Sequence, residues 1–227
     1  MTSNQTGVRA AGAWLTGASL LLTLALLFHG PLHPDLAMQM ARIGQSASRW
    51  AAVHWAAAAA CSCFAIAAVL MLVSHSRMTS TGATSSAWAV VLVGALWTLT
   101  TAVTEVTVIA DLAESGNVAQ FGPWWSFAQG YGNGFAILAI AVAVIAWNEH
   151  RDSHRLLPKW SAAMGTAAAL ASFAGWALGV WFHVRPASVL WLLASGLMCL
   201  WLAWLGVVLA RPNAARSPSD AAAHATS

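Results

Sequence analysis

Six long apolar segments, separated by short polar breaks, constrain this chain more than any other feature. They cover residues 12–29, 50–73, 86–110, 126–148, 160–182 and 188–210. An α-helix needs about 20 mostly apolar residues to cross the hydrocarbon core of a bilayer. In lipid, an unpaired backbone N–H or C=O group has no water to bond, so such segments must be helical. The sequence therefore predicts an all-α polytopic membrane protein, a bundle of six transmembrane helices.

The composition excludes several other classes of protein. Charged residues make up 7% of the 227 residues, and hydrophobic residues make up 59%. A soluble domain carries about 25% charged residues. A water-soluble domain, a disordered chain and a nucleic-acid-binding protein are thus excluded. The expected partner is the lipid bilayer, with another membrane protein or a second copy of the chain left open. The sequence has no Walker A, G-x-S-x-G or H-E-x-x-H motif, so it leaves open whether the chain is an enzyme and which residues would be catalytic.

The cationic residues predict how the helices are oriented. Seven of the ten would lie on one side of the membrane: Arg9, Arg77, Arg151, Arg155, Lys159, Arg211 and Arg216. The other three would lie on the opposite side: Arg42, Arg49 and Arg185. By the positive-inside rule, both termini are expected in the cytoplasm. The alanine-rich spans and short loops favour a bacterial plasma (inner) membrane. Residues 1–11 are expected to be a cytoplasmic N-terminus, and residues 211–227 a disordered cytoplasmic tail.

Glu105 is the one acidic residue well inside an expected span. A carboxylate in hydrocarbon is costly, so intramembrane acids usually face the interior of a bundle and mark a functional site. Thr98 and Thr101 precede Glu105 at helical spacing and share its face. A protonated Glu105 that bonds a neighbouring helix is the structural alternative.

Three histidines are expected at a similar depth to Glu105, each on a different helix. His29 ends the first span, His54 lies one turn inside the second, and His183 follows the fifth. All three, with Glu105, fall toward the outer side in the predicted orientation. Neutral imidazole is a common ligand for transition metals, and a carboxylate can complete such a site. The sequence therefore suggests a site for copper, zinc or iron, or for haem b held by His54 with His183 or His29.

Two other functions remain open at this stage. Glu105 and its threonines could serve a small-solute or proton-coupled transporter. Alternatively, the chain could be a non-catalytic subunit that scaffolds a larger membrane complex. Ala171, Gly175 and Gly179 recur every four residues, and such a stripe lets another helix approach closely.

Tryptophan and cysteine residues are expected to be structural. Most of the fourteen tryptophans, among them Trp50, Trp88 and Trp191, lie near span ends, which is typical of an interfacial belt. Four others, Trp97, Trp176, Trp201 and Trp204, lie deeper and are expected in the packed interior. The cysteines, Cys61, Cys63 and Cys199, predict no disulfide and no redox motif.

Overall fold

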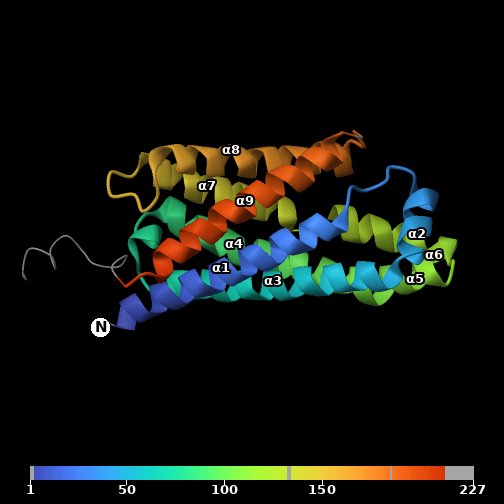
Figure 1. Cartoon of the computed structure of the whole chain (residues 1–227), viewed down its shortest axis with the longest axis horizontal. Helices are drawn as coiled ribbons and strands as arrows, with labels where there is room; N and C mark the ends of the chain where they lie inside the picture. Colours follow the sequence, from blue (N-terminus) through green and yellow to red (C-terminus); the bar gives the residue numbers. More distant parts are fainter. Residues whose placement is uncertain (1–2, 132–133, 185, 213–227) are drawn as a thin grey trace, which may run out of the picture.

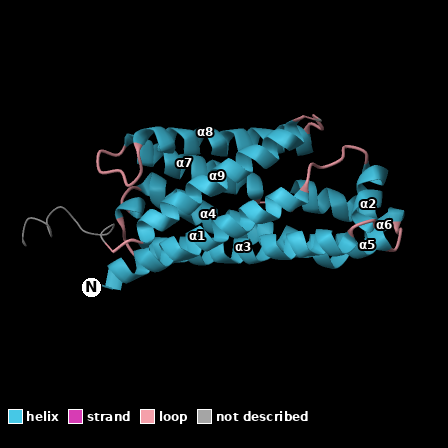
Figure 2. Ribbon diagram, in the orientation of Figure 1, coloured by secondary structure: helices cyan, strands magenta, loops and turns pink. Residues whose placement is uncertain are grey.

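The computed structural model describes residues 3–131, 134–184 and 186–212, and within these ranges every regular element is a helix (Figure 2). The long helices are α1 (Ser3–His29), α3 (Ala47–Val73), α4 (Gly82–Thr104), α7 (Phe135–Arg151), α8 (Lys159–Trp176) and α9 (Ala187–Ala210). The short helices are α2 (Leu36–Gly44), α5 (Ala110–Glu114) and α6 (Val118–Ser126), with a 3₁₀ turn η1 at Arg77–Thr79. Three π-helical segments are η2 (Glu105–Ile109), η3 (Phe127–Tyr131) and η4 (Ala177–Trp181).

The six long helices lie side by side and form a closed ring in chain order (Figure 1). Helix α1 contacts α3 and α9, and the contacts α3–α4, α4–α7, α7–α8 and α8–α9 complete the ring. The start of α1 and the end of α9 lie at one end of the bundle, here called the terminal end. Helices α2, α5 and α6 lie at the opposite end, here called the α2 end.

In the described part of the chain, five helices are long and apolar enough to cross a membrane. They cover Gln5–His29, Ala47–Val73, Gly82–Glu114, Lys159–Trp181 and Ala187–Ala210. The all-helical, multi-pass membrane class predicted from the sequence is therefore supported. The fourth expected span, residues 126–148, is not among the five. The described chain there divides into the end of α6, the segment η3, and α7 with only 17 residues.

The chain termini differ in part from the expectation. Helix α1 begins at Ser3, so most of the N-terminal segment expected to precede the first helix is helical. Val8 and Ala11 are buried, because this extension packs against the bundle. Of the expected disordered tail, residues 211 and 212 alone are described, and residues 213–227 lie outside the described part of the chain.

The expected small-residue stripe packs two helices of the same chain. A Cβ atom at Gly175 would collide with the backbone of Trp191, and one at Gly179 would press on Ser188. Both glycines belong to the α8–η4 rod, and both contacts lie on α9. The stripe thus brings α8 against α9, as small residues do in membrane bundles.

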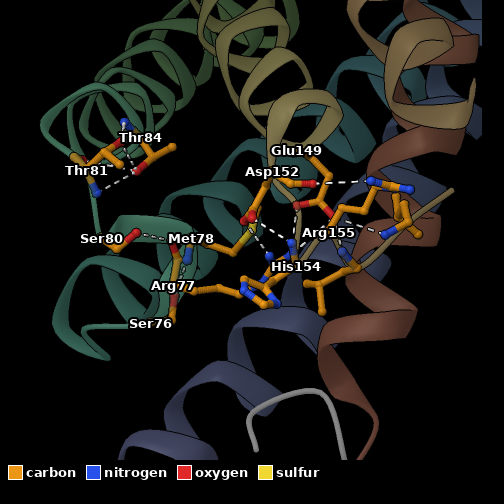
Figure 3. Close-up of polar contacts among 12 residues, drawn as sticks. Ser76, Arg77, Met78, Ser80, Thr81, Thr84, Glu149, Asp152, His154 and Arg155 are labelled. Atoms are coloured by element: carbon orange, nitrogen blue, oxygen red, sulfur yellow. Dashed lines mark hydrogen bonds and ion pairs between the residues drawn. The ribbon is translucent and has the colours of Figure 1, made fainter. Parts of the chain in front are cut away.

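A partly buried ion-pair network joins two loops at the terminal end (Figure 3). The Nη2 atom of Arg77, just after α3, lies 2.9 Å from Glu149 Oε2, and its Nη1 atom lies 2.6 Å from Asp152 Oδ2. Glu149 also accepts the backbone N–H groups of Leu156 and Leu157. Its side chain is 1% exposed. One carboxylate thereby fixes the α3–α4 loop to the α7–α8 loop.

Candidate functional site

Polar side chains are brought into the interior toward the α2 end of the bundle. Two of the π-helical segments contribute directly, since Glu105 begins η2 and Gln129 lies in η3. A π-helical turn widens the helix by one residue and is frequent at functional sites. In this chain it re-aims polar side chains near the end of an otherwise apolar rod.

Glu105 is buried, with 3% of its surface exposed. Its Oε2 atom accepts a hydrogen bond from Trp50 Nε1 at 3.2 Å, and its Oε1 atom accepts one from Gln129 Nε2 at 2.6 Å. The carboxyl group therefore joins α3, η2 and η3. Both of its oxygens act as acceptors in this network.

His29 and His54 lie beside this network, with ring centroids 5.1 Å apart. The Nδ1 atom of His54 lies 2.8 Å from the Trp50 carbonyl oxygen, and that of His29 lies 2.7 Å from the Gly30 carbonyl oxygen. A carbonyl can only accept, so each Nδ1 atom carries the proton. In a neutral ring, the Nε2 atom then holds a free lone pair. Within the described residues, neither Nε2 atom forms a hydrogen bond.

These residues line one small cavity, here called the inner cavity. It has a volume of about 70 Å³, and its polar lining comprises His29, His54, Thr98, Thr101, Glu105 and Gln129. Trp176 and Trp191 close its apolar side. A water molecule needs about 10–15 Å³ of such space. The inner cavity therefore has room for a few waters or a small ion.

A larger hollow of about 670 Å³, here called the vestibule, lies next to the inner cavity. Its lining includes His33, His183, Trp125, Ser126 and Trp181, and it also includes Gln129. His33 and Pro34, from the loop before α2, place it at the α2 end of the bundle. Among the described lining residues, Gln129 alone belongs to both hollows.

The structure brings together three of the four residues singled out in the sequence. His29, His54 and Glu105 share the inner cavity. His183 does not join them, because it lies in the vestibule, exposed and with a left-handed φ of 55°. Within the described part of the chain, no three His, Cys, Asp or Glu side chains are grouped closely enough to hold a metal ion. The expected three- or four-ligand metal site is thus absent there.

The haem expectation does not fit the inner cavity. Axial imidazoles on opposite sides of one iron place their ring centroids about 6 Å apart, since each metal–nitrogen bond is about 2 Å long. The rings of His29 and His54 are 5.1 Å apart and inclined at 60°. A 70 Å³ space is also far too small for the macrocycle. The other pair considered, His54 and His183, lines two different hollows.

Two residues of the site, Trp50 and Gln129, were not predicted. Trp50 was assigned to an interfacial belt, yet it is 6% exposed and donates to Glu105. Trp88 and Trp191 are likewise buried. Trp97 and Trp204 were expected in the packed interior, but their side chains are exposed. The available signal for Gln129 was an amide inside an otherwise apolar segment, where it must find a partner.

Comparisons with known proteins add nothing to the description of the site, which therefore depends on its geometry. No family model matches the chain, and no curated protein or solved structure matches it significantly.

Proposed function

We propose that this chain is a membrane protein that binds one monovalent copper ion, Cu(I), between His29 and His54. The observation that carries the proposal is the arrangement of the two imidazoles. Both line the inner cavity, and the Nδ1–H group of each donates a hydrogen bond to a backbone carbonyl oxygen. Metal-binding histidines are characteristically held by such a bond on the second ring nitrogen.

The spacing of the two rings suits a shared ion. Metal–nitrogen bonds of about 2 Å that meet at a tetrahedral or trigonal angle place imidazole centroids roughly 5 Å apart. The observed separation is 5.1 Å. Imidazole nitrogen is a good ligand for copper, and the inner cavity leaves space for a water molecule as a further ligand.

Charge balance favours a monovalent ion. A buried charge in a bundle interior is stable only when it is paired. Glu105 lines the same cavity and can supply one negative charge. One carboxylate neutralises Cu(I) fully but would leave Zn(II) with an unpaired positive charge.

The same proposal includes the location of the site. With the excess of Arg and Lys at the terminal end in the cytoplasm, the α2 end and the vestibule face outward from a bacterial plasma membrane. The chain would then receive copper from the outer side. The scaffold interpretation loses its motivating feature, because Gly175 and Gly179 are used to pack α9.

The test is a Cu(I) titration of the detergent-purified protein in competition with a chromophoric Cu(I) chelator. We expect one ion per chain, and a loss of affinity of about 100-fold in His29→Ala and in His54→Ala. His154→Ala is the matched control, since His154 lies in the α7–α8 loop at the terminal end, exposed to solvent. Absence of Cu(I) binding, or equal affinity in all three variants, would overturn the proposal. Zn(II) bound more tightly than Cu(I) would overturn the charge-balance argument and, with it, the choice of copper.

A further inference from the structure

We infer that the vestibule and the inner cavity are consecutive compartments of one passage, which the side chain of Gln129 closes. The inference deepens the proposed function, because it gives a route for the ion to His29 and His54. It rests on the proposed function for its purpose, but not for its geometry.

The first step is the position of Gln129. It lies in η3 and is 8% exposed. Among the described lining residues, it is the one that both hollows share. On one side of it lie the exposed Ser126 and His183, and on the other side lie Thr101 and Glu105. The Gln129 side chain, here called the partition, therefore lies between a hollow lined by exposed residues and one whose lining includes the buried Thr101 and Glu105.

The second step is how the partition is held closed. The amide Nε2 atom of Gln129 donates to Glu105 Oε1 at 2.6 Å. One rotamer change of the glutamine breaks this hydrogen bond and moves the partition aside. A cation in the vestibule can then reach the Glu105 oxygens. Once bound there, it occupies the acceptor that the amide needs to close the partition again.

The third step is selectivity. The Gln129 amide offers a carbonyl oxygen as well as an N–H donor. An entering cation can be passed from the amide oxygen to the carboxylate, whereas an anion meets the Glu105 charge behind the partition. The passage is therefore expected to admit small cations.

Cysteine accessibility tests the passage without any metal. Cys61, Cys63 and Cys199 are replaced by alanine to give a cysteine-free background. One reporter, Ser126→Cys, lies in the vestibule, and the other, Thr101→Cys, lies in the inner cavity. Each is treated in detergent with 2-aminoethyl methanethiosulfonate, a small cationic thiol reagent. We expect the vestibule reporter to react quickly. The inner reporter should react about tenfold faster with Gln129→Ala than without it, because the reagent no longer has to wait for a local opening of the structure around Gln129.

The controls separate a gate from general loosening. Gln120→Ala removes an exposed glutamine of α6 and is expected to change neither rate. Equal rates for the inner reporter with and without Gln129→Ala would overturn the inference, as would a similar rise at both reporters. Copper binding is measured separately. The passage can therefore be disproved while the copper site is supported, and the copper site can be disproved while the passage is supported.

Discussion

At the scale of single residues, the carboxyl group of Glu105 determines the site. It is buried and accepts one hydrogen bond from Trp50 and one from Gln129. Removing it would leave an indole N–H and an amide N–H without an acceptor. Each buried donor that loses its partner costs about 1–3 kcal/mol.

This network gives opposite expectations for two substitutions of Glu105. In Glu105→Gln, the new amide oxygen can accept from Trp50, while Gln129 flips its own amide to accept from the new NH₂ group. Thermal unfolding in detergent, followed by tryptophan fluorescence, should show little change. Glu105→Leu strands both donors and should lower the stability by roughly 2–4 kcal/mol. Equal stability of the two variants would contradict the network.

The same residues show how far a sequence can predict such a site. Glu105, His29 and His54 could be selected because a polar group in an apolar span must face the interior of the bundle. Trp50 could not, since a tryptophan near the end of a span is equally typical of the membrane interface. Its burial follows from the rotation of α3 about its own axis, which hydropathy does not determine. His183 was misplaced for a similar reason, because it lies just beyond a π-helical turn that shifts the helix end.

At the scale of elements, hydropathy predicts the long helices but not whether their backbone hydrogen bonds are α-helical or π-helical. The helices α1, α3, α4, α8 and α9 all fall on expected spans. The three π-helical segments were not foreseen, since widening a helix by one residue leaves its mean hydropathy unchanged. Yet two of these segments supply Glu105 and Gln129. The elements were predictable from composition, whereas the side chains they present depend on local backbone geometry.

The ion pairs of Arg77 with Glu149 and Asp152 at the terminal end provide a test of how elements are joined. Arg77→Ala leaves the Glu149 carboxylate, 1% exposed, without its cationic partner. The cost should be lower than the figure of about 3–5 kcal/mol for a fully buried pair, because the Arg77 side chain is 28% exposed and Glu149 keeps its bonds to the backbone N–H groups of Leu156 and Leu157. Asp152 binds the same guanidinium, but its side chain is 37% exposed.

We therefore expect Arg77→Ala to lower the free energy of unfolding by about 1–3 kcal/mol. Asp152→Ala should cost less than about 1 kcal/mol, as is usual for exposed pairs. Chemical denaturation in detergent, followed by fluorescence, distinguishes the two. A larger loss for Asp152→Ala than for Arg77→Ala would show that Glu149 is not the residue that fixes the two loops.

At the scale of the whole molecule, the position of the two chain ends determines how many times the chain passes along the bundle. Arg9 in α1 donates to the backbone oxygen of Ala210 at the end of α9, 3.3 Å away. Both ends of the described bundle thus lie together, which requires an even number of passages. Five helices are long and apolar enough to cross a membrane. The sixth passage along the bundle is made by α7, which leads from the α2 end to the terminal end.

Helix α7 is short for this task, and its neighbour η3 makes up the difference. Its 17 residues span about 26 Å at 1.5 Å per residue, against a hydrocarbon core of about 30 Å. We predict that the segment from η3 to α7 is a sixth membrane crossing. In the cysteine-free background, Gln120→Cys, before this segment, should react with an impermeant thiol reagent added to intact cells. His154→Cys, after it, should react only once the membrane is opened. Labelling of both positions from the same side would mean that α7 does not cross the membrane. An even number of membrane crossings would then require that a second long helix also fails to cross. In the ring of long helices α7 packs between α4 and α8, and this position beside two candidate spans is the reason for which we predict that it crosses as well.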